Sequence, residues 1–301
     1  MFGIAAAVVV LVAALILVGI ARRGRDAATG PEPRWTMRLV VAGGVVFPVI
    51  VLSLLWVLTL RDVSALSRPE TDPTVTVEVT GYRWWWEIRY PDEDVTTANE
   101  MHIPAGTPVR VRLLSGDVIH SFWVPQLGPK VDLIPGRTNT TWLQADHPGV
   151  YRGQCAEYCG LQHANMAFSV IADAPADFQA WVAREREDAR EPTSELELRG
   201  REVFSASACT ACHVVRGVSE EVAPGTKVTG PFEPVTAVAG PDLTHLASRG
   251  TLGAGTVPNT RGHLGGWIVD SQAIKPGNLM PPIELSGEDL TALIAYLESL
   301  E

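Results

Sequence analysis

Two long runs without charge near the start of the chain limit its fold more than any other feature. Phe2–Ile20 holds 19 such residues and Leu39–Leu60 holds 22. At about 1.5 Å of helix rise per residue, each run spans roughly 30 Å of hydrocarbon. A cleaved signal peptide is the alternative for the first run, but no positive charge precedes its apolar part. We therefore predict two transmembrane helices, at about residues 2–20 and 39–60.

The charges around these runs predict which side of the membrane the rest of the chain occupies. The connecting loop is rich in arginine: Arg22, Arg23, Arg25, Arg34 and Arg38. After the second run comes only Arg61, beside Asp62. The positive-inside rule then places the loop in the cytoplasm. Residues 1–61 are expected to form a helical hairpin in a bacterial plasma membrane, with all later residues on the outer side. Two helices are too few to enclose a channel, so the hairpin is an anchor or a contact with a membrane partner.

The net charge of −10 argues against nucleic acid as a partner, because its phosphates call for a basic surface. The charge is uneven: residues 1–61 carry +4, whereas residues 62–190 and 191–301 carry −7 each. An acidic outer surface suits a basic protein donor that docks by complementary charge.

Alternating apolar residues predict strands after the hairpin. Turn signals separate them, at residues 104–106, 135–136 and 148–149, and no convincing helix lies between residues 72 and 172. The apolar positions of these strands are Val75, Val77, Val79, Val109, Val111, Leu113, Trp142 and Val150. Residues 62–173 are therefore predicted to form a small antiparallel β sandwich or barrel.

A cluster of soft metal ligands lies late in this segment. Cys155, Cys159, His163 and Met166 fall within twelve residues, and His120 follows a valine-rich strand 35 residues before Cys155. A disulfide would leave the imidazoles and the thioether unexplained. A zinc site of two Cys and two His would leave out the thioether. Softer copper accepts all these groups, and two thiolates can bridge two copper ions, each with one terminal His.

At this point the sequence resembles subunit II of cytochrome c oxidase, over about residues 1–190. The hairpin, the indoles at 84–86, the His120 strand, residues 130–137 and the ligand loop carry the resemblance. It implies a cupredoxin fold with the dinuclear copper centre called CuA. It also implies a Mg²⁺ at the contact with subunit I, reached by the side chain of Glu157. The implied copper ligands are His120, Cys155, the carbonyl of Glu157, Cys159, His163 and Met166. Quinol-oxidising relatives keep the fold but lack these ligands.

Three consecutive indoles carry a further implication. Strand alternation puts Trp84 and Trp86 on one face and Trp85 on the other. Indoles often pack in a core or rest at a membrane surface. In the family, the first Trp of the cluster is an exposed residue over CuA at which electrons enter. The resemblance thus implies that Trp84 is exposed and accepts electrons.

A second outer domain follows a helix at about residues 174–188 and a linker that ends near 195. Residues 196–301 end in a predicted helix at about Gly287–Leu300, and glycine- and proline-rich loop fills much of the stretch before it. Such a thin core indicates a bulky cofactor. Cys209-Thr-Ala-Cys212-His213 is the attachment motif for haem c, with a redox disulfide or half a zinc site as alternatives. The thiols would bond the haem vinyl groups, and His213 would ligate iron.

The sixth iron ligand has to come from further along the chain. Candidates are His245, His263 and Met280, and a lone Met can also simply pack in a core. Met280 lies in Pro276–Pro282, which resembles the axial-Met loop of class I cytochrome c. We therefore expect a mono-haem, all-α cytochrome c domain with His213 and Met280 as axial ligands.

These two centres predict electron transfer without a catalytic residue in this chain. The haem domain would accept electrons from soluble cytochrome c or another donor, and CuA would pass them to subunit I. There, in an oxidase with a subunit III as well, oxygen would be reduced to water with proton translocation. The alternatives are a free-standing membrane-tethered carrier and a subunit of a CuA-containing nitric oxide reductase.

Overall fold

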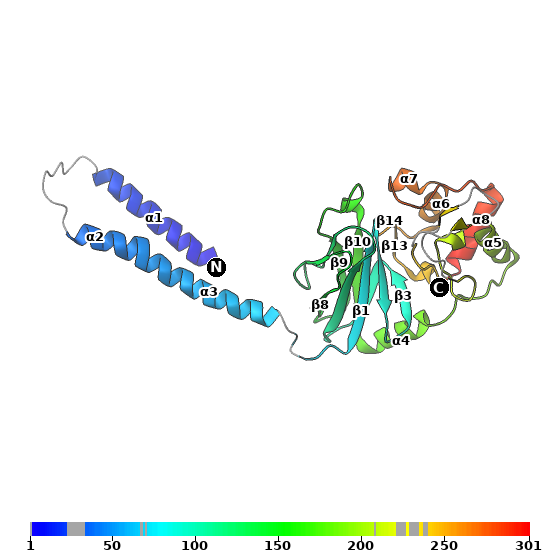
Figure 1. Ribbon diagram of the computed structural model, residues 1–301, viewed down its shortest axis with the longest axis horizontal. Helices are drawn as coiled ribbons and strands as arrows, with labels where there is room; N and C mark the ends of the chain where they lie inside the picture. Colours follow the sequence, from blue (N-terminus) through cyan, green and yellow to red (C-terminus); the bar gives the residue numbers. More distant parts are fainter. Residues whose placement is uncertain are drawn as a thin grey trace. The chain divides into compact units, whose positions relative to one another are not determined.

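The computed structural model describes residues 2–22, 34–66, 69, 71–207, 209–220, 227–228, 235–236 and 240–301. The chain divides into two compact units, Met1–Ser67 and Arg68–Glu301 (Figure 1). The first unit is helical. The second contains a β sandwich, the ligand loop and a helical part that carries the haem motif.

The first unit consists of long apolar helices. Helix α1 spans Phe2–Arg22, and α2 (Arg34–Val41), the π turn η1 (Ala42–Val46) and α3 (Phe47–Leu66) follow one another without a break. Within the described residues, Trp35–Ser64 is long and apolar enough to cross a membrane, and the apolar part of α1, Ala5–Ala21, is shorter than that. The two-helix hairpin therefore stays a prediction. Arg23 and Arg25 of its loop lie outside the described residues.

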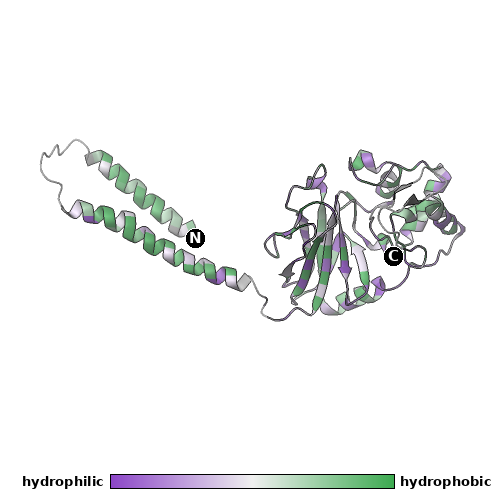
Figure 2. Ribbon diagram, in the orientation of Figure 1, coloured by the Kyte–Doolittle hydropathy of each residue, from purple (hydrophilic) through white to green (hydrophobic). Residues whose placement is uncertain are grey.

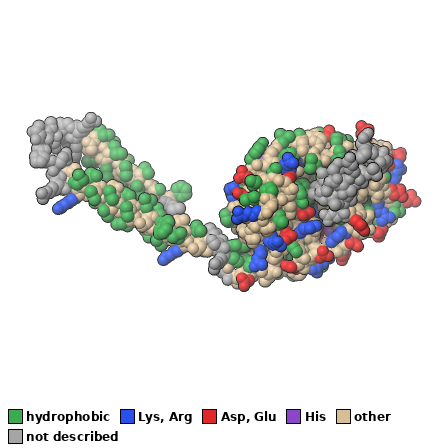
Figure 3. Space-filling view, in the orientation of Figure 1, with side chains coloured by type: hydrophobic (Ala, Val, Ile, Leu, Met, Phe, Trp, Pro, Cys, Tyr) green, Lys and Arg blue, Asp and Glu red, His purple; other side chains and the backbone are tan. Residues whose placement is uncertain are grey.

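The surface of these helices is mostly apolar. Figure 2 shows these helices mostly green, with purple at a few positions near the ends of the α2–α3 run, and Figure 3 shows that most charged side chains gather over the second unit. Large side chains such as Leu17, Ile50 and Trp56 are more than half exposed. Soluble proteins rarely expose so large an apolar surface, so these helices suit a membrane anchor.

The β sandwich has two five-stranded sheets. The first has the order β3 (Val95–Ala98), β2 (Trp85–Tyr90), β1 (Val75–Tyr82), β5 (Val109–Ser115) and β8 (Asn139–Leu143). The second has the order β4 (Glu100–Pro104), β10 (Ala167–Asp173), β9 (Gly149–Cys155), β6 (His120–Trp123) and β7 (Val131–Leu133). The predicted inward residues of β1 and β5 are buried between the sheets together with Trp86 and Phe168, except Val75, which is partly buried.

The prediction of a purely antiparallel sandwich is wrong, because both sheets are mixed. Strand β1 pairs in parallel with β5, with Val77 opposite Val111, and β4 pairs in parallel with β10. The apolar alternation of a strand fixes which face is buried, but it does not specify the direction of its neighbour. The only described helix between residues 71 and 172 is the 3₁₀ turn η2 (His163–Asn165).

Helix α4 (Pro175–Glu185) closes the open end of the sandwich core. The predicted face of Phe178, Trp181 and Val182 is buried, and the Trp181 ring lies 5.2 Å from that of Tyr90. The helix ends three residues earlier than predicted.

In the haem-motif part, α5 (Glu195–Ala206) crosses α8 (Gly287–Glu298) in close contact. A Cβ on Gly200 would overlap the carbonyl oxygen of Ala292, so glycine is required at the crossing. Capping side chains begin both helices, Ser194 for α5 and Ser286 for α8. The predicted C-terminal helix is thus confirmed, although it ends at Glu298.

Two further helices, α6 (Arg261–Val269) and α7 (Ser271–Ile274), lie in the stretch that was predicted as loop. Three of the nine residues of α6 are glycine, which hides its apolar periodicity. Gly265 lets α6 pack on α8, because a Cβ there would lie 3.0 Å from Cδ1 of Ile294. The remaining short elements are η3 (Cys209–Ala211), β11 (Lys227–Val228), β12 (Val235–Thr236), η4 (Leu246–Ser248), β13 (Thr251–Leu252) and β14 (Val257–Pro258).

Candidate metal and haem centres

The predicted copper ligands come together at the end of the second sheet. Strand β9 ends at Cys155, and the loop to β10 carries Cys159, His163 and Met166. Strand β6 pairs with β9, with Phe122 opposite Cys155, and this pairing brings His120 beside the loop. Both cysteines are buried, and His120 is inaccessible to solvent.

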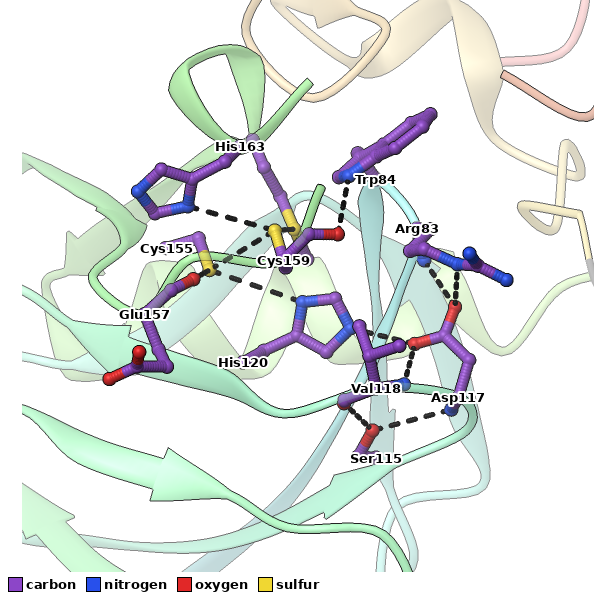
Figure 4. Close-up of polar contacts among 11 residues, drawn as sticks. Arg83, Trp84, Ser115, Asp117, Val118, His120, Cys155, Glu157, Cys159 and His163 are labelled. Carbon is purple, nitrogen blue, oxygen red and sulfur yellow. Dashed lines mark hydrogen bonds and ion pairs between the residues drawn. The ribbon is translucent and has the colours of Figure 1, made fainter. Parts of the chain in front are cut away.

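The two sulfur atoms occupy the middle of the site (Figure 4). Sγ of Cys155 lies 3.7 Å from Sγ of Cys159 and 3.9 Å from Nδ1 of His120. Sγ of Cys159 lies 3.7 Å from Nδ1 of His163 and 3.8 Å from Sδ of Met166. The carbonyl oxygen of Glu157 lies 3.1 Å from Sγ of Cys155. Each sulfur thus has its own imidazole and one weaker donor.

This donor set fits two soft metal ions better than the alternatives. A disulfide has an S–S distance of about 2.05 Å, and both thiols are free at 3.7 Å. The ligand atoms of His120, Cys155 and Cys159 lie within 4.8 Å of one another, close enough to share a metal. A lone tetrahedral zinc would have no use for the thioether of Met166.

Asp117 fixes the orientation of the His120 ring, and the sequence reading missed it. Its Oδ1 lies 2.8 Å from Nε2 of His120, which leaves Nδ1 facing the sulfur pair. The backbone amides of Arg83 and Val118 also donate to this carboxylate. Burial alone would raise the pKa of Asp117, but these hydrogen bonds lower it below its usual value. Burial likewise opposes the charge of His120, yet the hydrogen bond to Asp117 raises the pKa of His120.

The two thiols titrate as a pair in the metal-free chain. The hydrogen bond with Cys159 is the largest cause that lowers the pKa of Cys155, and the same contact raises the pKa of Cys159. Two adjacent thiolates would repel each other, so the pair retains one proton. Metal binding would displace that proton, and copper uptake should therefore weaken as the pH falls.

Changing Asp117 to Asn should reduce copper affinity by about 10- to 100-fold, the usual effect of losing a partner that orients a metal-ligating His. The asparagine amide is neutral, so it stabilises positive charge on the His120 ring less than the carboxylate does. It also holds Nδ1 of His120 toward the sulfur pair less firmly. Copper titration of the metal-free chain would measure the change. Asp146→Asn is the matched control, because Asp146 is exposed and accepts a hydrogen bond from Gln144, away from the copper ligands. Equal affinities in the two variants would contradict the role of Asp117.

Trp84 lies directly over the copper loop, but the expectation that it is exposed is wrong. Its side chain is 8% exposed, and its Nε1 donates a 3.0 Å hydrogen bond to the carbonyl oxygen of Cys159. Glycines from two loops approach its ring: Gly160 of the ligand loop and Gly277, three residues before Met280. The indole is buried because the segment with Gly277 covers it. Trp84 lies in the turn between β1 and β2, so the expected strand alternation does not extend to it; within β2, Trp86 is buried and Trp85 is partly exposed.

The carboxylate of Glu157 has a different partner from the carbonyl of the same residue. Its Oε2 lies 3.7 Å from Nζ of Lys130, which also contacts Asp132. Mg²⁺ requires about six oxygen ligands, and a carboxylate paired with a lysine supplies few of them. A Mg²⁺ here would depend on ligands from another subunit, so it stays an implication of the resemblance.

The haem motif presents two free thiols and a fixed imidazole. Cys209 begins the short turn η3, and Cys212 follows directly after it. Nδ1 of His213 lies 2.8 Å from the carbonyl oxygen of Pro241, which leaves Nε2 for a metal. Burial lowers the pKa of His213 and so favours the neutral ring that ligates iron. A Cβ on Gly240 would lie 2.6 Å from the carbonyl oxygen of Cys212, so this close approach requires glycine. These features fit a covalently bound haem.

The two other histidines of this domain are engaged elsewhere. The ring nitrogens of His245 face the carbonyl oxygens of Glu301 at 2.7 Å and Glu187 at 3.1 Å. His263 is exposed on α6, with Nδ1 2.7 Å from Oγ1 of Thr260.

The backbone of Met280 is braced, because its N–H donates to Asn278 and its carbonyl accepts from Ser271 and Gln272. Met280 is therefore the candidate best suited to be the axial ligand, which stays a prediction.

Comparisons with known proteins agree with both centres. Residues 93–173 match the family described as cytochrome c oxidase subunit II, periplasmic domain, and residues 198–301 match cytochrome c. The chain is 40% identical over 262 residues to cytochrome c oxidase subunit 2 of Alkalihalophilus pseudofirmus, covering 85% of this chain and 71% of that protein. It is 33% identical over 273 residues to cytochrome c oxidase subunit 2 of Bacillus sp. strain PS3, covering 85% and 72%.

A crystal structure of the periplasmic domain of subunit II of cytochrome oxidase from Bradyrhizobium japonicum is also similar. It is 33% identical, covers 38% of this chain and 96% of that chain, and has a TM-score of 0.38. The identity and coverage of the full-length relatives decide the assignment. The chain belongs to the cytochrome c oxidase subunit 2 family, part of a haem–copper oxidase, and carries a cytochrome c domain after its copper domain.

Proposed function

We propose that this chain is the subunit through which electrons reach the oxidase. Its haem c domain accepts them from soluble cytochrome c or another donor, and its CuA domain passes them to subunit I, where oxygen is reduced to water with proton translocation. The N-terminal helices anchor the chain beside subunit I in the plasma membrane, with residues after 61 on the outer side. When bound, the haem and the copper pair each supply a centre that gains and loses one electron.

The residues of this chain hold these groups and exclude water from them. Cys209 and Cys212 would bond the haem, and His213 and Met280 would ligate its iron. The donors around the two buried cysteines would hold copper in the dry end of the sandwich. A donor set without an open coordination position favours a carrier over a site for substrate chemistry.

The position of Trp84 is the observation that carries the proposal. Its Nε1 donates to the carbonyl oxygen of Cys159, and its ring meets both redox loops. A Cβ on Gly160 would lie 3.1 Å from Cζ2 of the indole, and a Cβ on Gly277 would lie 3.6 Å from its Cη2. One aromatic ring thus contacts the loop of the copper ligands and the loop of Met280. We infer that electrons pass from haem to copper by way of Trp84.

The covered indole also bears on where an outside donor binds. A soluble cytochrome c could contact Trp84 only by displacing the segment with Gly277. External donors would therefore dock on the haem domain, which the acidic outer surface would favour for a basic partner.

Changing Trp84 to Ala should slow haem-to-copper electron transfer severalfold or more while both centres stay loaded, because the variant loses the ring between the loops. Flash photolysis of the full chain in detergent would measure the rate. Trp85→Ala is the matched control: this neighbouring indole stacks on Tyr82 at 5.0 Å. Unchanged rates in the Trp84 variant, at intact haem and copper content, would reject this route.

A further inference from the structure

Lys275 is a buried cation at the junction of the copper and haem domains. Its side chain is 1% exposed. The ammonium donates to the carbonyl oxygens of Trp84 at 2.8 Å, Asn165 at 2.7 Å and Gly253 at 2.6 Å. Its three N–H donors therefore meet three acceptors, and the described residues include no ion pair to it.

The three acceptors come from both domains. Trp84 and Asn165 belong to the copper domain, and Asn165 directly precedes the copper ligand Met166. Gly253 belongs to the haem domain, as does Lys275, which lies five residues before Met280. One side chain thus holds together the backbone under the indole, the end of the copper loop and the start of the Met280 loop.

A lysine is a costly choice for this position. Burying an ammonium is unfavourable, and burial lowers the pKa of Lys275 to about 7. Only the charged form of Lys275 has a donor for each of the three carbonyl groups. An apolar side chain of similar length could fill the space without the cost of desolvation, but it would leave the three carbonyl groups without this donor.

Other contacts between the domains surround the lysine. Nε2 of Gln162 donates to the carbonyl oxygen of Pro276 at 2.9 Å. The amide of Ala167 donates to the carbonyl oxygen of Ala254 at 3.0 Å, and the amide of Gly250 donates to Glu100 at 2.9 Å. These are single hydrogen bonds with backbone or neutral donors, whereas Lys275 joins three segments through one charge.

We propose that Lys275 is a positioning residue that fixes the haem domain on the copper loop and thereby sets the geometry for electron transfer across Trp84. The ammonium holds the backbone of Trp84, while Gly277, two residues after Lys275, packs against the indole. Without the ammonium, the haem domain separates from the copper loop more often. Electron transfer then waits for the domains to meet again. The docking role stands on the contacts alone, whereas the electron-transfer role rests on the proposed function.

The test compares Lys275→Met with the full wild-type chain in detergent, with haem and copper loaded and their absorption spectra checked. Hydrogen–deuterium exchange of peptides that contain the Ala167 and Gly250 amides reports docking, and flash photolysis reports transfer. We expect exchange at these two amides to accelerate tenfold or more and transfer to slow tenfold or more. Peptides from β1 and α8, inside each domain, should stay protected. Lys275→Gln keeps two N–H donors, so its changes in amide exchange and in transfer rate should be smaller. This variant replaces the Met variant in the test if the Met variant does not fold.

Arg261→Met is the matched control, because Arg261 is a half-exposed cation of the haem domain that pairs with Glu298 at 2.6 Å. It should change neither measurement. Unchanged protection of both amides in the Met and Gln variants would overturn the proposal. Lost protection with an unchanged transfer rate would support the docking role and overturn the electron-transfer role, together with the proposed route through Trp84.

Discussion

Replacing Cys159 by Ser is expected to abolish the dinuclear copper centre. Its sulfur lies within 3.8 Å of three other donor atoms, on Cys155, His163 and Met166. A serine hydroxyl is a harder donor and is protonated at neutral pH, so it cannot replace the second bridging thiolate. Metal analysis of the purified chain should find two copper ions in the wild type and at most one in the variant.

Met166→Leu is the control for this experiment, because it removes a weak donor and keeps both thiolates. It should retain two copper ions with an altered absorption spectrum. One copper ion, or zinc, per wild-type chain would contradict the dinuclear assignment. Two copper ions in the Cys159 variant would show that the second thiolate is not a bridge.

Replacing Met280 by Ala is expected to remove the sulfur-to-iron absorption feature of the oxidised haem. The variant should keep its haem, because Cys209 and Cys212 would hold the group covalently. The loop should also keep its shape, because the hydrogen bonds of Met280 involve its backbone N–H and carbonyl, which alanine retains. Absorption spectra of the oxidised chain and the haem content per chain would measure the two effects.

His263→Ala should leave the same spectrum unchanged, since His263 is exposed and bonded to Thr260. A wild-type protein that lacks the feature would reject Met280 as the axial ligand. His245 would then have to give up its contacts with Glu301 and Glu187 to reach iron.

The copper ligands could be predicted because most of them lie close together in the sequence. Cys155 to Met166 form a single loop between two adjacent strands, so their contacts depend on local chain geometry. His120 is 35 residues away, and the sequence indicated only that it follows a valine-rich strand; the structure places it at the start of β6. The capping serine and the apolar stripe of α8 were visible for the same local reason.

The features that the sequence did not reveal depend on distant segments. The direction of β5 beside β1 depends on the strands that cross between the sheets. The burial of Trp84 depends on Gly277, 193 residues later in the chain. Lys275 gave no signal, because a single lysine between Ile274 and Pro276 reads as a surface residue. Asp117 gave a weak signal, because a carboxylate three residues before a metal-binding His can reach the ring of that His.

The contact between α5 and α8 has a consequence for how the haem domain is made. Arg199 and Asp289, 90 positions apart, form a 2.9 Å ion pair beside the close crossing at Gly200. The haem-motif thiols of Cys209 and Cys212 lie just after α5. They therefore leave the ribosome long before α8, the helix that packs against α5. Chains emerge at about 5–20 residues per second, so several seconds separate these events. During that interval α5 lacks its main packing partner α8, so the two thiols would be accessible to haem before the fold closes around them.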